Sequence, residues 1–379
     1  MRAVVGKHDG ATTNPGNMHP ALEPFTFQRT GKRIRNRCVL AAMTNKQSEE
    51  NGVLSEEEIR WLFARSKGGF GIVTTAAAHV QEDGKGWNGE FGVWSDAHLD
   101  GLTELATAIR THGALSLVQL FHGGMRAPEA LTGRQPKSAS QNRISDELGS
   151  SRAMTEAEIL ETIEAFGKAA QRCEAAGFDG VELHGAHGYL IAQFLGKATN
   201  RRHDAWGDSS AARQRFLSAI VESVRANTSP SFLVGVRLSP EQASGGIELT
   251  DALETVEVCN ALPLDFVHVS CWDYTITASH DDRNQAYTTW FRDVLRNDLP
   301  LISTGGVWDA ADARTVMDQG ADMVGVARAG IAHPDWPRFL EEGCEAPKRP
   351  PFSPDWLKQA SLSSVFVDYM RRWDGFVEP

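Results

Sequence analysis

The sequence predicts an α/β fold, a (β/α)₈ TIM barrel with an N-terminal hairpin, a long loop after the third strand and a C-terminal tail. Apolar runs of strand length recur eight times, and segments with helical periodicity separate them. These runs are nearly continuous, as in parallel strands that are covered on both faces. No Gly-x-Gly-x-x-Gly motif opens a first helix, which favours the barrel over an open doubly wound sheet.

Residues 1–24 form an extension rich in Gly, Asn, Thr and Pro. A short hairpin is predicted next, from the apolar residues at Phe25 to Phe27, the polar residues around Gly31 and the apolar Ile34. The eight predicted strands follow at residues 37–43, 70–75, 114–121, 178–184, 232–238, 264–270, 301–304 and 321–326. We therefore assign residues 25–345 to the barrel.

The segments between these strands carry helix signals. Two pairs have the spacing of a capping box, Ser55 with Glu58 and Thr155 with Glu158. In this motif the hydroxyl and the carboxylate each accept a hydrogen bond from the other residue's backbone N–H. Apolar stripes at helical spacing follow both pairs. Several of the predicted helices end at a glycine, a common terminator.

Two segments fall outside the repeat. Residues 123–151, after the third strand, are too long for a structural connection and predict a lid or a pocket wall. A proline-rich linker follows residue 345, and a tail with apolar and aromatic positions runs on to residue 379. We expect residues 346–379 to pack on the barrel or on a neighbouring subunit.

Charge and cysteine content exclude several classes of function. Lys and Arg total 38, Asp and Glu total 49, and the formal net charge is −11. Such a protein repels nucleic-acid phosphates and anionic lipid, and no apolar run reaches membrane-spanning length, so neither partner is expected. The five cysteines form no Cys-x-x-Cys pair, which predicts reduced thiols in a cytoplasmic protein. The oligomeric state stays open, a homo-oligomer included.

The fourth predicted strand ends in a cluster of polar rings. In this fold the active site lies at the carboxyl ends of the strands, and here the chain reads His184-Gly-Ala-His187-Gly-Tyr189-Leu. Two N–H donors can hold a carbonyl oxygen and stabilise an enolate, while a phenol donates a proton. Two other interpretations are a metal site, with His122 as a further ligand, and satisfied core histidines. No His-x-His or His-Glu-x-x-His spacing supports the metal.

That motif resembles the substrate-binding signature of the old yellow enzyme family, as do the residues that follow it, Phe194-Leu195 and Thr199-Asn200-Arg201-Arg202. Members of this family are NADH:flavin oxidoreductases and ene-reductases. Other strand ends resemble the family in the same order along the chain. They are Ala41-Ala42-Met43-Thr44 at the first strand, Ala77 at the second, Gln119 at the third, Arg237 at the fifth, Gly305 and Gly306 after the seventh, and Ala327 and Arg328 after the eighth. The ordered set, from about residue 34 to residue 334, is more specific than any single motif.

The resemblance implies an FMN cofactor, NADH or NADPH as hydride donor, and an enone-type substrate whose activated C=C bond is reduced. It places Thr44 near flavin O4, Gln119 on the pyrimidine edge, Arg237 near N1 and O2, and the last two loops at the phosphate. A fixed cation near N1 favours the reduced ring, and Arg328 can grip a phosphate with two N–H groups. Taken singly, Arg237 also suits a structural salt bridge, and Gln119 a core hydrogen bond.

The same resemblance assigns His184 and His187 to the substrate oxygen and Tyr189 to protonation of the α-carbon. Trp272 and Tyr274, after the sixth strand, suit either the substrate pocket or ordinary packing. Two alternatives for the whole protein are a metal-dependent barrel hydrolase or lyase that uses the histidine pair, and a non-catalytic flavin carrier. A carrier would not need the tyrosine.

Some positions depart from the family pattern. Ala42 replaces a proline, and Ala327 replaces a glycine of the phosphate loop, where a methyl group could crowd the approach of the backbone. Arg371, Arg372 and Trp373 weakly resemble tails that some bacterial members extend into a neighbouring subunit.

Overall fold

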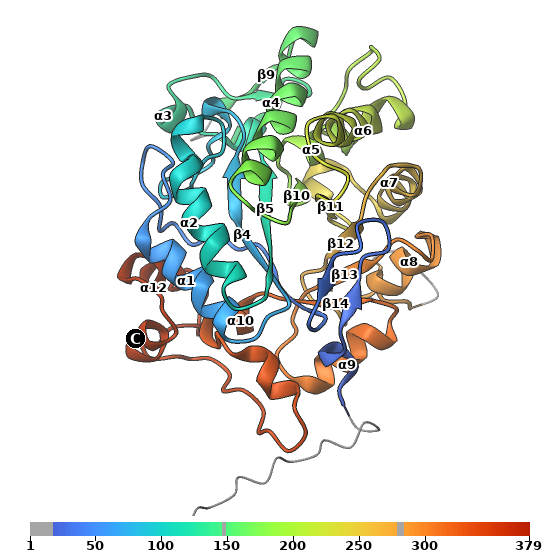
Figure 1. Ribbon diagram of the computed structural model, residues 1–379. Helices are drawn as coiled ribbons and strands as arrows, with labels where there is room; N and C mark the ends of the chain where they lie inside the picture. The colour runs from blue at the N-terminus through green and yellow to red at the C-terminus, as the bar shows by residue number, and fades with distance from the viewer. Residues whose placement is uncertain (1–17, 146–148, 279–283) are drawn as a thin grey trace, which may run out of the picture.

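Eight parallel strands close into a barrel in the order β3-β4-β5-β10-β11-β12-β13-β14 in this computed structural model, which describes residues 18–145, 149–278 and 284–379. The strands are β3 (Cys38–Leu40), β4 (Ile72–His79), β5 (Leu115–Phe121), β10 (Gly180–Gly185), β11 (Leu233–Leu238), β12 (Phe266–Ser270), β13 (Leu301–Thr304) and β14 (Met323–Val326). Helices surround them on the outside (Figure 1). Each predicted apolar run overlaps one of these strands, so the barrel prediction is confirmed.

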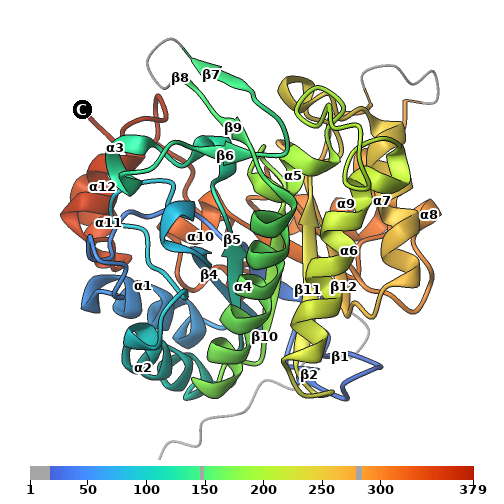
Figure 2. The ribbon, with the colours of Figure 1, turned by 90° about the horizontal axis from the view of Figure 1, so that it is seen from above.

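The predicted hairpin is present and plugs the amino-terminal end of the barrel. Its strands β1 (Phe25–Thr26) and β2 (Arg33–Ile34) pair antiparallel. Phe27, which is 1% exposed, packs inside against Phe266 and belongs to a cluster with residues from the amino-terminal parts of β4, β5, β11, β13 and β14. Figure 2 shows this hairpin and the β7–β8 ribbon on opposite sides of the barrel. Residues 1–17 of the predicted extension lie outside the described residues.

The helices that connect the strands pack their apolar stripes on the barrel. They are α1 (Glu56–Lys67), α2 (Leu99–Arg110), α4 (Glu156–Ala175), α5 (Leu190–Leu195), α6 (Ser210–Ala226), α7 (Leu249–Ala261), α8 (Tyr287–Val294), α9 (Ala310–Asp318) and α10 (Arg328–Ala332). Thr155 and Glu158 form the complete capping box predicted for α4. Ser55 caps α1, but the carboxylate of Glu58 is buried and accepts from Asn45 and Ser48 instead, so the second half of that predicted box is absent.

The segment after β5 folds into short elements on the outside of the strand ends. They are α3 (Glu129–Thr132), β6 (Lys137–Ser138), β7 (Arg143–Ser145), β8 (Gly149–Ser150) and β9 (Arg152–Ala153). Strand β6 pairs with β9, and β7 pairs with β8. The segment contacts α5 through β6 and residues 124–126, and contacts the turn at residues 82–84 through α3.

The C-terminal tail packs on its own barrel. Its helix α12 (Ser364–Met370) lies beside α1 (Figure 1), and α11 (Pro354–Gln359) contacts α12 and α10. The ring of Phe366 meets that of Trp61 edge-on at 5.3 Å between centroids, and the backbone N–H of Ser363 donates to Gln47. The tail is thus part of the wall around the strand ends.

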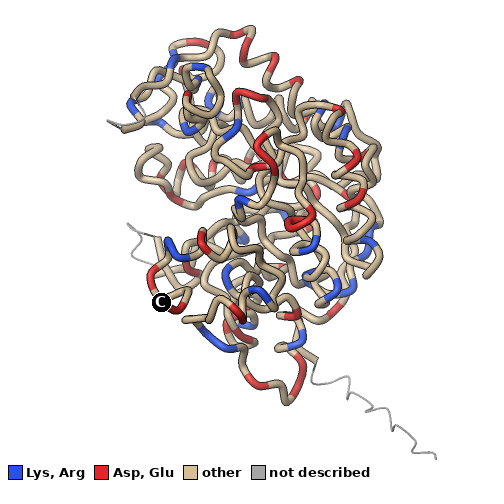
Figure 3. The backbone as a smooth tube through the Cα atoms, turned by 90° about the vertical axis from the view of Figure 1, so that its left-hand side faces the viewer, with Lys and Arg blue, Asp and Glu red and all other residues tan. Residues whose placement is uncertain are grey.

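Acidic and basic positions are interspersed along the chain (Figure 3). None of the helices that the structure describes is both long enough and apolar enough to cross a bilayer. Four of the five cysteines are buried, Cys344 is exposed, and all five are free thiols.

Arg65 of α1 joins three parts of this wall and is fully buried. Its guanidinium donates to the carbonyls of Trp61, Gly330, Ile331 and Ala360, which belong to α1, α10 and the tail. Arg65→Met removes these four hydrogen bonds to buried carbonyls, so we expect the free energy of unfolding to fall by about 3 kcal/mol. Arg60→Met, on the exposed face of the same helix, should change it by less than about 0.5 kcal/mol. Urea denaturation followed by circular dichroism measures both, and equal midpoints for the two variants would contradict the role of Arg65.

Candidate functional site

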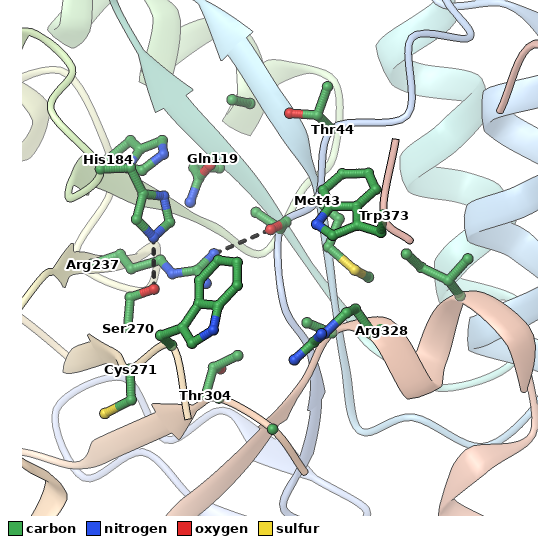
Figure 4. Close-up of a pocket in the computed structure, with 18 of the residues that line it drawn as sticks. Met43, Thr44, Gln119, His184, Arg237, Ser270, Cys271, Thr304, Arg328 and Trp373 are labelled. Carbon is green, nitrogen blue, oxygen red and sulfur yellow. Dashed lines mark hydrogen bonds between the residues drawn. The ribbon is translucent and has the colours of Figure 1, made fainter. Parts of the chain in front are cut away.

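A cavity opens where the carboxyl ends of the strands converge, with an empty volume of about 1130 Å³ that includes its open mouth (Figure 4). All but two of the predicted site residues line it. They are Ala42, Met43, Thr44, Ala77, Gln119, His184, His187, Tyr189, Arg237, Trp272, Gly305, Gly306, Ala327 and Arg328. Barrel closure thus brings together residues from strand ends, or from the loops that follow them, that are far apart in the sequence.

The two exceptions are Ala41 and Tyr274. Ala41 is buried behind the lining, where its backbone N–H extends the pairing of β3 with β14 by donating to Val326. The hydroxyl of Tyr274 donates to Asp312 of α9 at 2.7 Å, outside the cavity lining. This corrects the expectation that Tyr274 lines the substrate pocket, since of these two aromatic residues after β12 only Trp272, which is 74% exposed, belongs to the lining.

The expected pocket wall at residues 123–151 also needs correction. None of its described residues lines the cavity, because the segment lies over the outside of the strand ends. Arg126 instead stands behind the polar rings. Its guanidinium carbon lies 4.6 Å from the centroid of the Tyr189 ring, and its Nη1 donates to the carbonyl of His187.

Three polar rings, from the end of β10 and the turn after it, converge at one end of the cavity. His184 lies on β10, His187 follows in a turn with φ of 59°, and Tyr189 precedes the first residue of α5. The ring centroids are 5.0 Å apart for the two histidines and 4.9 Å apart for His184 and Tyr189. Nε2 of His187 is hydrogen-bonded to the hydroxyl of Ser270 at 2.8 Å. One small group can therefore contact all three rings.

Burial keeps these rings uncharged. Burial, followed by the positive charge of Arg237, lowers the pKa of His187 to about 3, and burial also lowers the pKa of His184 well below its usual value. Burial raises the pKa of Tyr189 above its usual value. The Nδ1 atom of His184 accepts the backbone N–H of Ala186, so its single proton is on Nε2. The site thus offers neutral donors at neutral pH.

Arg237 brings a buried cation to the centre of the cavity. Its side chain is nearly fully buried, Nη1 donates to the carbonyl of Ala42 at 3.1 Å, and Nε has no hydrogen-bond partner in the described part of the chain. A buried N–H group without an acceptor costs about 1–3 kcal/mol, so this group fits a bound ligand that carries negative charge or lone pairs. The pyrimidine edge of FMN, which becomes anionic on reduction, has that property.

The loop after β13 and the start of α10 form the other end of the cavity. Gly305 has φ of +154°, and a Cβ atom there would lie 2.4 Å from the carbonyl oxygen of Cys271, so only glycine fits. Arg328 stacks on Trp272 with its guanidinium carbon 5.7 Å from the ring centroid. A cation beside a glycine turn suits a phosphate. Ala327, which replaces the family's glycine, has φ of −109° and so does not adopt the left-handed conformation that favours glycine.

Several residues of the lining were not predicted. They are Trp87, Ser270, Cys271, Thr304, Val307, Trp308, Ile331, Tyr369, Met370 and Trp373. Ser270 and Thr304 are the last residues of two predicted strands, so the rule that identified the other strand-end residues also applied to them. Trp87 and the tail residues come from irregular or terminal segments, in which no sequence pattern marks a site.

The metal interpretation needed a further ligand beside the histidine pair. His122 lies outside the lining, where its Nε2 contacts Asp83 at 3.3 Å and its Nδ1 accepts the backbone N–H of Gly124. Within the described ranges, no group of three or more His, Cys, Asp or Glu side chains could hold a metal ion. The structure therefore separates the three histidines that this interpretation combined.

Comparison with known proteins agrees with the chemistry of the cavity. The model of the NADH:flavin oxidoreductase / NADH oxidase family matches residues 21–346. The chain is similar to the probable NADH-dependent flavin oxidoreductase YqiG of Bacillus subtilis, 38% identical over 332 residues, 86% of this chain and 89% of the relative. It is similar to an NADPH dehydrogenase of Halalkalibacterium halodurans, 32% identical over 312 residues, 81% of this chain and 90% of the relative.

A solved structure agrees as well. The old yellow enzyme homologue from Zymomonas mobilis matches with a TM-score of 0.77 at 26% identity, covering 86% of this chain and 94% of that chain. The cofactors are therefore FMN and, as the hydride donor, NADH or NADPH.

If Arg328 binds the phosphate of FMN, Arg328→Met should weaken FMN binding by about ten- to a hundredfold, the value of one or two charge-assisted hydrogen bonds. Riboflavin, which lacks the phosphate, should bind the variant and the parent equally. Quenching of flavin fluorescence on titration into apoprotein measures both affinities. Arg338→Met, an exposed arginine paired with Asp335 outside the cavity, is the matched control. An equal loss of riboflavin and FMN affinity would show that Arg328 does not contact the phosphate.

Proposed function

The chain belongs to the NADH:flavin oxidoreductase / NADH oxidase family, and from this premise we propose that it is an ene-reductase. It would use NADH or NADPH to reduce the activated C=C bond of α,β-unsaturated carbonyl compounds. The observation that carries the proposal is the convergence of His184, His187 and Tyr189 at one end of the cavity that also contains Gln119 and Arg237. Bound FMN supplies hydride transfer through its N5 atom, in from the nicotinamide and out to the substrate.

The histidines bind the carbonyl oxygen of the substrate. His184 offers its Nε2–H. The ring of His187 is held in place by its hydrogen bond with the Ser270 hydroxyl, and the backbone N–H of His187 donates to the Ser239 hydroxyl. Because both rings are neutral and pre-positioned, they stabilise the negative charge that grows on this oxygen without any reorganisation of solvent. Withdrawal of electron density from the carbonyl makes the β-carbon electrophilic.

Tyr189 donates the proton that completes the reduction. Its pKa is raised by burial, so the hydroxyl keeps its proton until the α-carbon of the enolate becomes basic. The ring of Phe121 meets that of Tyr189 edge-on at 4.9 Å between centroids, and the guanidinium of Arg126 lies over the same tyrosine ring. This cation stabilises the phenolate that remains after transfer.

Aromatic side chains enclose the place for the substrate. Trp87, Trp272, Tyr369 and Trp373 line the cavity, from the loop after β4, the loop after β12 and the tail. Flat apolar walls exclude water and favour planar conjugated molecules, which enones are.

The proposal is tested by anaerobic spectroscopy of the purified protein. The flavin absorbance should bleach on addition of NADH or NADPH and return on addition of cyclohexenone or maleimide, with one molecule of saturated product for each flavin reoxidised. Bleaching without reoxidation by either enone would contradict the ene-reductase assignment and indicate another electron acceptor, whereas a flavin carrier would not bleach.

Tyr189→Phe removes the proton donor and keeps the ring. We expect the rate of flavin reoxidation by cyclohexenone to fall by about a hundredfold, as is typical for loss of a general acid, while flavin reduction by NADH or NADPH stays within about twofold. Stopped-flow absorbance separates the two half-reactions. Tyr274→Phe, a tyrosine on the far side of the cavity wall, should change neither rate. Equal loss in both half-reactions would contradict the assigned role.

The same half-reaction should be insensitive to pH. The lowered histidine pKa values keep both rings neutral above about pH 5, and the raised pKa of Tyr189 keeps its proton on up to about pH 9. Reoxidation rates with cyclohexenone should then vary by less than about twofold over this range. An inflection near the ordinary histidine pKa of 6.5, lost in His184→Asn, would show that a charged imidazole takes part.

A further inference from the structure

A chain of four hydrogen-bonded side chains crosses the barrel beneath the cavity. Nε2 of Gln119 donates to Oε1 of Glu182 at 2.7 Å, Nδ1 of His268 lies 2.6 Å from Oε2 of Glu182, and Nε2 of His268 lies 2.5 Å from the hydroxyl of Thr304. All four residues are at most 3% exposed. Gln119 and Thr304 line the cavity, whereas Glu182 and His268 lie below the lining. No step of the proposed reaction uses the two inner residues.

The register of the barrel creates this chain. Glu182 of β10 stands directly opposite Gln119 of β5, and Arg237 of β11 stands opposite both His184 and His268. Glu182 and His184 are two residues apart on one strand, so both point to the interior. The carboxylate is therefore fixed by strand pairing and not by a mobile loop.

Glu182 is ionised and His268 is neutral. Burial by itself would raise the pKa of Glu182, but the hydrogen bonds from His268 and Gln119 and the positive charge of Arg237 bring it below its usual value. Burial lowers the pKa of His268. The positive charge of Arg237 balances the buried carboxylate, so no proton is needed to neutralise it.

An ionised carboxylate only accepts hydrogen bonds, and this decides how Gln119 is oriented. The NH₂ group of the Gln119 amide must face Glu182, so its carbonyl oxygen is the atom left for the cavity. The neutral ring of His268 likewise gives its Nδ1–H to Glu182, and its Nε2 accepts the hydroxyl proton of Thr304. Both ends of the chain then present lone pairs to a ligand.

We infer that Glu182 is a positioning residue for FMN recognition. It holds the Gln119 carbonyl toward the cavity, where that oxygen accepts the imide N–H of the isoalloxazine ring. His268 occupies the second carboxylate oxygen and so prevents Glu182 from turning. The inference depends on FMN binding, which family membership establishes, and not on the substrate that the enzyme reduces.

Glu182→Gln should reverse the Gln119 amide. His268 donates from Nδ1, so the carbonyl of the introduced amide turns toward it and the introduced NH₂ group faces Gln119. Gln119 must then offer its carbonyl to that NH₂ group and present its own NH₂ group to the cavity, where it meets the imide N–H donor to donor. We expect the dissociation constant of FMN to rise about tenfold or more, the loss of at least one net hydrogen bond.

A double-mutant cycle on FMN affinity tests this path, with the dissociation constant measured by fluorescence quenching of FMN titrated into apoprotein. If Glu182 acts through Gln119, Glu182→Gln weakens FMN binding in the parent chain but changes it by less than about twofold in the Gln119→Leu background. Equal effects in both backgrounds, or no effect in the parent, would overturn the inference.

Asp265→Asn is the matched control for the loss of a buried carboxylate. Asp265 accepts from Arg29 and Arg225 at the plugged end of the barrel, away from the cavity. Its loss should lower the apoprotein's unfolding temperature and leave FMN affinity unchanged, and a comparable loss of affinity would show that Glu182 is merely structural. Where Glu182→Gln apoprotein does not fold, Glu182→Asp serves in the same cycle, because it keeps the charge but is one methylene too short to reach both partners.

Discussion

Closure of eight parallel strands is the constraint on which the whole molecule depends. Because every strand runs in the same direction, every carboxyl end arrives at one mouth, while the hairpin with Phe27 fills the other end. Residues far apart in the sequence, such as Gln119 on β5 and Arg237 on β11, thereby face one cavity. The same register places Glu182 beside Gln119, so the geometry below the cavity follows from the geometry of the barrel itself.

The charged and neutral side chains of the site stand where the proposed ligand groups require them. Arg237 and Arg328 are cations in a protein with a net charge of −11, and they stand where a ring edge and a phosphate carry negative charge. His184 and His187 donate hydrogen bonds as neutral rings, because burial makes protonation costly. Glu182 offsets the charge of Arg237 without entering the cavity. Fixed dipoles and fixed charges of this kind need no reorganisation during a reaction.

The tail and the loops form the side walls of the cavity, which the barrel strands alone do not provide. Tyr369, Met370 and Trp373 reach the cavity from α12 and the turn after it, and Arg65 fastens this tail to α1 and α10. Trp87 and Trp272 complete the aromatic walls. These side chains set the shape of the space for the substrate, so differences in substrate between relatives with the same barrel are expected to arise in these segments.

The sequence by itself determined the alternation of strands and helices, the capping of α4 and the identity of most strand-end residues, because apolar period and capping are local properties of the chain. Tertiary structure decided the rest. The carboxylate of Glu58 accepts from Asn45 and Ser48 and not from the predicted cap, and the loop after β12 places Trp272 at the cavity while Tyr274 bonds to Asp312. The segment at 123–151 folded over the outside, and the tail came to lie on its own barrel. Each of these outcomes depends on contacts between segments distant in sequence, and no periodicity within one segment encodes such contacts.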